Sequence, residues 1–249
     1  MVNKHQLAQK SDLFLKQIVD AQVDLYLEED SYYQKLASPL KSADQLKQEH
    51  REHIQSTLLM KEFRDSLSHA ISLIFNELPK TLHPNEFAKV QDEMEHILDF
   101  LDEPVPESYE GEPVIFHKLW NISDETLHHI HHFANGLIQR KQYEDAHDVL
   151  SFLVTLAPDI SRFWSCRALC LQAMNKQDEA LQVLQVAKIL APDDPVPMIY
   201  SCNGYLHLKD KKKATEELKM LESCLDAHPE SKAAWQPIQK SLKDFVRRL

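Results

Sequence analysis

Three stretches in the second half of this chain repeat one pattern of residues every 34 positions. When the sequence is shifted by 34, small and apolar residues superpose at fixed offsets. The superposed sets are Ala134, Ala168 and Cys202; Ala146, Ala180 and Ala214; and Leu150, Leu184 and Leu218. Pro158 and Pro192 also align, and Asp226 takes the third position. A period of this length with a closing proline predicts a series of helix–turn–helix units.

The period and the small residues are typical of tetratricopeptide repeats. In each unit helix A must approach helix B closely, and the small residues would stand at the crossing. A larger side chain there would push the helices apart and cost about 1–3 kcal/mol. Scarce glycine, with only three residues, also favours helix over tight turns. The predicted fold class is therefore all-α.

Residues 102–113, DEPVPESYEGEP, predict a linker, because three prolines, one glycine and five acids cannot sustain a helix or pack a core. We place the domain boundary here. The predicted parts are an N-terminal helical region, 1–113, ending in this acidic linker; a repeat domain, 114–249, with repeats at about 127–160, 161–194 and 195–228; and a capping helix, 231–249. The third repeat lacks the closing proline, so we expect its helix B to run longer.

Apolar stripes predict three amphipathic helices before the linker, at 7–25, 54–78 and 87–101, the second ending at Pro79. Ser123 is expected to cap the first repeat helix, with Asp124 and Glu125 in its first turn. The capping helix carries the stripe Trp235, Ile238, Leu242, Phe245 and Leu249, which we expect to cover the apolar face of the last repeat.

Charge is distributed unevenly along the chain. Residues 1–113 carry 11 Lys and Arg against 22 Asp and Glu, whereas the remainder carries 17 of each. Without a basic excess, nucleic-acid binding is not expected, and anionic membranes would repel the N-terminal part. The sequence shows no apolar run of membrane-spanning length and no signal-peptide core, and its four cysteines lack disulfide-framework spacing. We therefore expect a cytoplasmic protein without direct membrane insertion.

Helix-A side chains that point away from helix B predict a concave, peptide-binding groove. These residues mix apolar groups with amides and imidazoles, which suits an extended client segment. The alternative is that they are ordinary surface residues. The predicted groove residues are His128, His131, Asn135, Ile138 and Gln139; Arg162, Ser165, Leu169, Gln172 and Ala173; and Val196, Ile199, Asn203, Leu206 and His207.

One known mode of groove binding does not fit. Repeat domains that clamp the terminal carboxylate of heat-shock chaperones use lysine, asparagine and arginine at set concave positions. Asn135 matches one of these positions, but the others hold His131, Cys166, Val196 and Tyr200. Without the cations we do not expect a carboxylate clamp.

The repeat block comprises the stretches ANGLIQRKQYEDAHDVLSFLVTLAPD, FWSCRALCLQAMNKQDEALQVLQVAKILAPDDP and CNGYLHLKDKKKATEELKMLESCL. With the terminal helix, these stretches resemble the class II chaperones of bacterial type III secretion, the SycD/LcrH type. The resemblance covers about half of the chain. It implies cytosolic escort of hydrophobic translocator proteins, with an amphipathic client segment in the groove. It also implies a homodimer through the N-terminal helices, although the family's N-terminal segment is usually short.

No constellation of residues predicts catalysis, a cofactor or a metal site. His128 and His132 are four residues apart, a spacing that can chelate zinc, but no second helix offers an obvious Cys or carboxylate partner. Cys166 and Cys170 have the same spacing, and a buried helix face explains them better. Phosphate loops, dinucleotide fingerprints and nucleophile elbows are absent from the sequence. We predict a non-enzymatic protein.

The leading hypothesis is a type III secretion chaperone that binds an apolar segment of a hydrophobic translocator or effector protein. The alternative is a repeat adaptor that assembles folded cytosolic proteins. A chaperone should bind an extended peptide through its concave face, whereas an adaptor should bind a folded partner through its outer faces.

Overall fold

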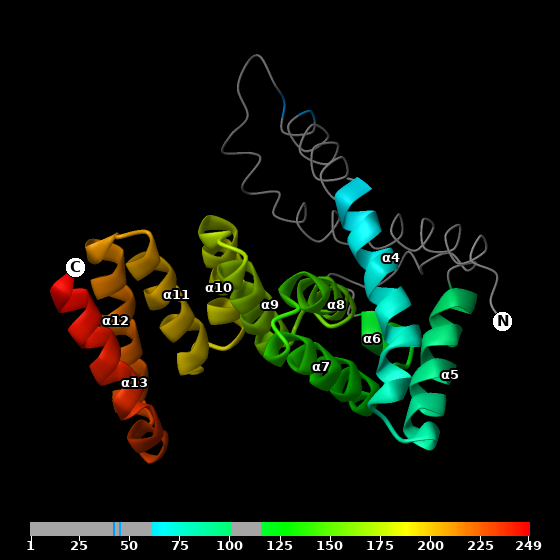
Figure 1. The fold of residues 1–249 in the computed structure, drawn as a ribbon. Helices are drawn as coiled ribbons and strands as arrows, with labels where there is room; N and C mark the ends of the chain where they lie inside the picture. Colours follow the sequence, from blue (N-terminus) through cyan, green and yellow to red (C-terminus); the bar gives the residue numbers. More distant parts are fainter. Residues whose placement is uncertain (1–41, 43–44, 46–60, 101–115) are drawn as a thin grey trace. The chain divides into compact units, whose positions relative to one another are not determined.

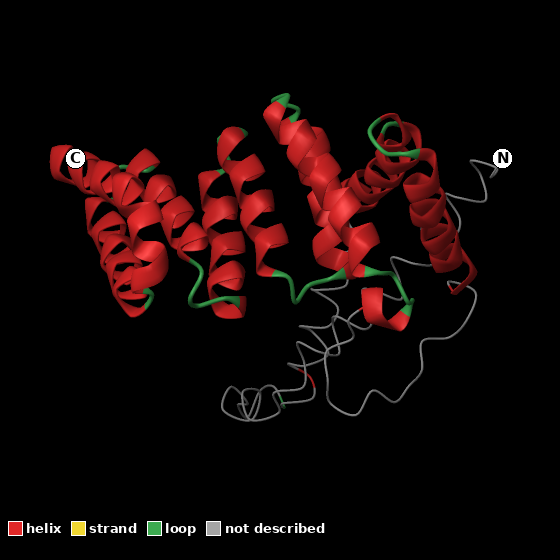
Figure 2. Ribbon diagram, turned by 90° about the horizontal axis from the view of Figure 1, so that it is seen from below, coloured by secondary structure: helices red, strands yellow, loops and turns green. Residues whose placement is uncertain are grey.

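The computed structural model describes residues 61–100 and 116–249, together with Ser42 and Gln45. Every regular element within these residues is a helix (Figure 2), so the all-α class is confirmed. The chain divides into two compact units, 1–130 and 131–249. The predicted linker at 102–113 and the predicted helix at 7–25 lie outside the described residues, and the domain boundary after residue 113 stays a prediction.

The first unit contains four described helices besides the start of α7 (Figure 1). They are α4 (Lys61–Asn76), the 3-10 helix η1 (Leu78–Lys80), α5 (Pro84–Phe100) and α6 (Phe116–Leu119). Helix α4 buries Leu67 and Ile74 on one face, as its apolar spacing predicts. It ends at Asn76 rather than at the expected Pro79. Proline disfavours helical backbone in the residue before it, and Pro79 lies in η1 instead.

Helix α7 (Asp124–Gln139) begins as the sequence predicts. The Thr126 amide donates to Ser123 Oγ at 3.2 Å, which confirms Ser123 as the cap. Ser123 in turn donates from its amide and its hydroxyl to Glu93 Oε2, at 2.9 and 3.0 Å. Lys89 Nζ also lies 2.5 Å from Glu125 Oε2. These contacts join the start of α7 to α5.

Three helical hairpins and a terminal helix follow one another along the chain. The hairpins are α7 with α8 (Tyr143–Leu156), α9 (Ser161–Ala173) with α10 (Gln177–Leu190), and α11 (Pro195–His207) with α12 (Lys211–Ala227); the terminal helix is α13 (Pro229–Arg248). Helix α12 has 17 residues whereas α8 and α10 have 14, so the longer helix B predicted for the third repeat is confirmed. Helices α8 and α10 both end two residues before a proline.

The small residues at the predicted crossings have no solvent exposure. They are Ala134, Ala146, Ala168, Ala180, Cys202 and Ala214. In the third hairpin Cys202 Sγ donates to the Ala214 carbonyl at 3.5 Å, so side chain and opposite backbone are in direct contact. Close approach of helix A to helix B is thus seen directly in the third hairpin, and the full burial of the small residues in the other two agrees with the predicted crossings.

Each hairpin turn contains a residue other than glycine in the left-handed conformation. Lys141, Asn175 and Lys209 have φ values of 61°, 64° and 58°, and they are 34 residues apart. The amide that follows each of them donates to a carbonyl five residues back, as in Gln142 to Leu137 and Asp210 to Tyr205, both at 2.9 Å. This pattern ends helix A in the same way each time. The sequence signals these three turns only by their 34-residue spacing, since none of the left-handed residues is glycine.

Helix α13 covers the last hairpin, as predicted, but only part of the predicted stripe faces it. Leu242 and Val246 are 3% and 6% exposed and pack in one core cluster with residues of α11 and α12. Phe245 and Leu249, which the predicted stripe placed against the repeat, are 55% and 42% exposed. The predicted stripe is therefore correct for Trp235 and Leu242, which pack with this cluster, and wrong for Phe245 and Leu249. Helix α13 carries two adjacent apolar rows, and only one fits against α12.

The second and third hairpins are joined by a buried ion pair. Lys188 Nζ on α10 lies 2.6 Å from Glu217 Oε1 on α12, and both side chains are 8% exposed. The second carboxylate oxygen of Glu217 has no hydrogen-bond partner among the described residues. By the 34-residue spacing, the equivalent positions between the first and second hairpins hold Val154 and Val183. The positions that hold an ion pair at the second repeat junction therefore hold two valines at the first.

Lys209→Gly should raise the free energy of unfolding by about 0.5–1 kcal/mol, because glycine adopts a positive φ without the steric cost of a Cβ. Urea unfolding followed by circular dichroism measures the change. Asn175→Gly should gain less, since asparagine tolerates this conformation. The control is Lys176→Gly, at a φ of −91°, which should lose stability. An equal gain in the control would contradict the explanation.

Lys188→Val should lower the free energy of unfolding by about 3–5 kcal/mol, because it leaves Glu217 buried without its cation. The double variant Lys188→Val/Glu217→Val recreates the apolar pair of the first junction and should be at least as stable as the wild type. Thermal and urea unfolding of both variants give the comparison. A double variant as unstable as the single one would show that the pair itself stabilises the junction.

Candidate functional site

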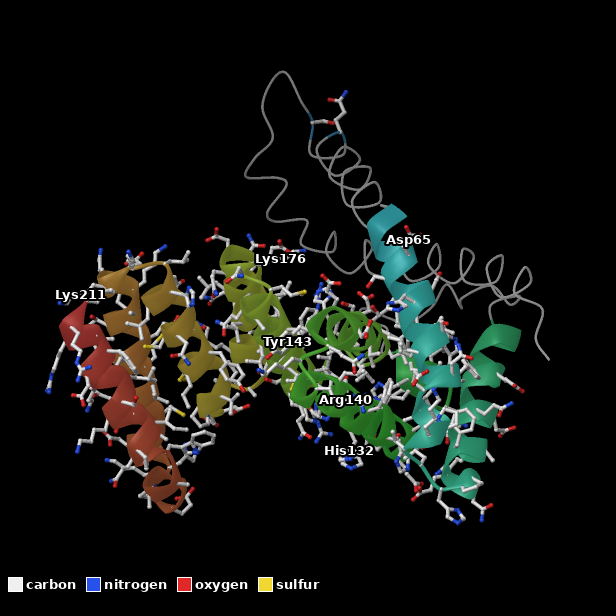
Figure 3. The ribbon with its side chains drawn as sticks, viewed as in Figure 1. Asp65, His132, Arg140, Tyr143, Lys176 and Lys211 are labelled. Atoms are coloured by element: carbon white, nitrogen blue, oxygen red, sulfur yellow. The ribbon has the colours of Figure 1, made fainter. Side chains whose placement is uncertain are left out.

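The predicted groove residues lie on the three helices A, and their exposure differs. His128, Gln139, Arg162, Ala173, Asn203 and His207 are exposed; His131, Asn135, Ile138, Leu169, Gln172, Val196 and Leu206 are partly exposed; Ser165 and Ile199 are buried. All of these residues except His128 belong to the second unit. Figure 3 shows their helices with side chains attached and labels His132, which neighbours His131. Their role in binding stays a prediction.

The two buried members contribute to packing between helices. Ile199 is 5% exposed and belongs to the core cluster formed by α11, α12 and α13. Ser165 is 2% exposed, and its hydroxyl donates to the Ser161 carbonyl at 3.3 Å. A charge at Ile199 would therefore disturb the core as well as any surface. Substitutions that test binding belong at the partly exposed positions.

One group of predicted residues meets across the first two hairpins. His131 Nε2 on α7 lies 3.4 Å from Asn135 Nδ2 and 3.5 Å from Cys166 Sγ on α9. Cys166 Sγ also donates to Asn135 Oδ1 at 3.8 Å. The His131 ring packs against Phe163, with 5.1 Å between ring centroids. These contacts fix the orientation of the His131 ring, the Asn135 amide and the Cys166 thiol, which a peptide backbone could reach.

The thiols near this surface are not activated. Burial raises the pKa of Cys166 to about 11 and that of Cys170 to about 12. Both thiols are protonated at neutral pH, and the protonated form is a weak nucleophile and a weak metal ligand. The His131, Asn135 and Cys166 cluster therefore has the chemistry of a hydrogen-bonding surface.

A second junction orders α9 against α11. Gln172 Nε2 donates to the Tyr200 carbonyl at 2.8 Å, and Gln177 Nε2 donates to the Gln172 carbonyl at 3.3 Å. A Cβ added at Gly204 would lie 3.0 Å from Gln172 Nε2 and 3.1 Å from Leu181 Cδ2. The absence of a side chain at Gly204 thus allows α11 to approach the second hairpin closely. The hydrogen bond to the Tyr200 carbonyl fixes the orientation of the Gln172 side chain.

The third hairpin and the terminal helix form a pocket of about 460 Å³ that is open to solvent. It is lined by three predicted groove residues and three residues of the chain's end: Asn203, Leu206, His207, Phe245, Arg248 and Leu249. The last three were missed by sequence reasoning, which assigned Phe245 and Leu249 to the core. The second apolar row, Leu242 and Val246, was the signal that could have revealed the alternative face.

No three His, Cys, Asp or Glu side chains come together as possible metal ligands anywhere in the described ranges. The rings of His128 and His129 are 6.3 Å apart, and His129 Nε2 lies 3.8 Å from Glu125 Oε1. Among the residues that the structure describes, no helix is both long enough and apolar enough to cross a membrane.

Three hairpins with small residues at each crossing, joined head to tail and closed by a terminal helix, define a tetratricopeptide-like repeat protein. Its candidate site is the row of helix-A side chains and the pocket at its C-terminal end. Neither feature contains an activated nucleophile.

Among solved structures, the chain is similar to the type III secretion translocator chaperone SycD of Yersinia enterocolitica. The TM-score is 0.50 and the identity 24%, covering 53% of this chain and 99% of that chain. PcrH from Pseudomonas aeruginosa gives 0.46 and 17%, covering 51% and 93%. The likeness to SycD shows the fold and confirms, at that level, the resemblance predicted from the sequence. No protein-family model and no curated protein matches the sequence.

Proposed function

We propose that this protein is a cytoplasmic, non-enzymatic chaperone of type III secretion that holds an apolar or amphipathic segment of a translocator protein. The observation that carries the proposal is a row of partly exposed apolar side chains on the helices A. The row comprises Ile138, Leu169, Val196 and Leu206, with at least one residue from each hairpin. The fold shared with SycD, a translocator chaperone, supports it.

The chemistry of this row suits an extended client segment. Apolar side chains of the client would enter between the row's members, while the exposed Asn203 offers its amide to the client's backbone. A translocator must later enter a membrane, so its apolar segments would otherwise aggregate or attach to the wrong surface. Micromolar affinity, about −8 kcal/mol, would shield such a segment and still allow release.

Leu169→Glu should weaken client binding by about tenfold or more, because it places a charge against an apolar side chain at the centre of the row. The client is first identified by affinity purification from the native host and mass spectrometry. Titration calorimetry with the client's apolar segment then measures the affinity. Circular dichroism verifies that the variant is folded.

The matched control is Gln182→Glu, which introduces the same charge at an exposed position of α10, a helix B. It should leave the affinity unchanged. Equal binding by the wild type and Leu169→Glu would refute the groove proposal.

A second candidate function, a repeat adaptor for folded proteins, is favoured by apolar side chains on the helices B. Ile189 is 80% exposed, Leu190 39% and Met220 47%. A folded partner would bind there, so Ile189→Glu would abolish its binding while Leu169→Glu would not. That pair of results would replace the chaperone proposal by the adaptor.

We further propose a homodimer, as the resemblance implies for the N-terminal helices. Light scattering on the full chain should then give twice the 29.0 kDa of one copy. Removal of residues 1–60 should return the mass to that of a single, shorter chain. A single-copy mass for the full chain at working concentration would reject the dimer.

A further inference from the structure

The pocket between α11 and α13 is lined by exposed and partly exposed apolar side chains. Phe245 and Leu249 are one turn apart on α13 and are 55% and 42% exposed, and Leu206 of α11 lines the same pocket. Asn203 and His207, both exposed, stand at its edge. Exposed apolar side chains of this size are unfavourable in water and mark surfaces that become covered.

The exposed row is not a consequence of poor packing by α13. Leu242 and Val246, also one turn apart, already hold the helix against α11 and α12. Phe245 and Leu249 form a second row directly beside the first. The cap therefore needs only one apolar row for its structural role, and the second is available to a partner.

One cation lines this pocket, and three more follow closely in the sequence. Arg248 lines it, and α12 begins with Lys211, Lys212 and Lys213 only four residues after His207. Figure 3 labels Lys211 at this end of the third hairpin. The N-terminus of α12 adds the positive end of its helix dipole. The pocket thus combines apolar walls with the guanidinium of Arg248, and the basic start of α12 follows soon after it in the sequence.

Two nearby acids pair with two of the cations at this end of the domain. Asp210 Oδ2 lies 3.9 Å from Lys213 Nζ, so this lysine is already paired. Asp210 Oδ1 accepts from the Lys213 amide at 3.0 Å, and Asp244 Oδ1 lies 3.7 Å from Arg247 Nη1. Within the described ranges, neither Arg248 nor Lys211 forms an ion pair. Arg248 is therefore free to meet a carboxylate that arrives from outside the chain.

We propose that this pocket binds a large apolar side chain of the client segment whose neighbouring side chains are acidic. The inference rests on the proposed function and deepens it, because it names the sequence character that the C-terminal end of the groove selects. The apolar walls Leu206, Phe245 and Leu249 receive the anchor. Arg248, supported by the lysines of α12, pairs with the acids and fixes the direction of the segment.

Fluorescence anisotropy on the full chain tests the proposal with two labelled 14-residue peptides. Both have a central Leu-Ile pair; two glutamates flank it in one peptide and two lysines in the other. The glutamate peptide should bind about fivefold tighter, since each exposed ion pair contributes modestly. Arg248→Glu should reverse this preference. Phe245→Ala should weaken binding of both peptides about tenfold by removing a wall of the pocket.

Two matched controls separate the pocket from general effects of charge and packing. Arg247→Glu makes the same charge change one residue away, at a side chain that pairs with Asp244 and does not line the pocket. Ile238→Ala removes another exposed apolar side chain of α13. Both controls should keep the wild-type preference and affinity within about twofold, because neither side chain touches the pocket.

Several results would overturn the inference. They are equal binding of the two peptides, no binding of either, equal effects of Arg248→Glu and Arg247→Glu, and no effect of Phe245→Ala. A change of oligomeric mass on Arg248→Glu would instead assign the pocket to a second copy of this chain. If Leu169→Glu abolishes binding of the purified client while the pocket variants leave it unchanged, the proposed function stands and this inference fails.

Discussion

The rest of the repeat domain depends on the close approach of two helix backbones within each hairpin. Alanine or cysteine at six positions removes the side-chain volume that would keep the helices apart. Once the hairpins are narrow, their outer apolar residues can be shared between neighbours, as in the cluster that joins α11, α12 and α13. Many helix-A side chains on the opposite side are then left partly exposed. The candidate binding surface thus results from the close packing of helix A against helix B within each hairpin.

Much of this architecture could be predicted from the sequence, because the 34-residue period repeats the same packing problem three times. Small residues, closing prolines and the Ser123 cap each act within a few residues, and local rules describe them well. Two features escaped these rules. Lysines at 141 and 209 adopt a conformation that a sequence normally signals by glycine. Helix α13 has two apolar rows, and only its packing against α12 decides which is buried.

The candidate site was predictable in outline and not in detail. Repeat position identified the helix-A side chains that point away from helix B, but it did not identify Ser165 and Ile199 as buried. The pocket residues Phe245, Arg248 and Leu249 come from the chain's end, to which no repeat position applies. The groove therefore has two components. The helix-A side chains recur with the repeat and could be predicted from it. The pocket residues of α13 follow the last repeat and could not.

The ionic contact between Lys188 and Glu217 has a consequence for the order of the repeats. In the structure each of these charges faces the other, whereas the first junction has valine at both equivalent positions. If the third hairpin packed on the first, Glu217 would face Val154 and lose its cation in a dry environment, which is strongly unfavourable. The ion pair thereby favours packing of each hairpin on its own neighbour, although the repeats are similar to one another. Because Lys188 and Glu217 are matched only between the second and third hairpins, the pair discourages exchange of hairpins between copies of the chain.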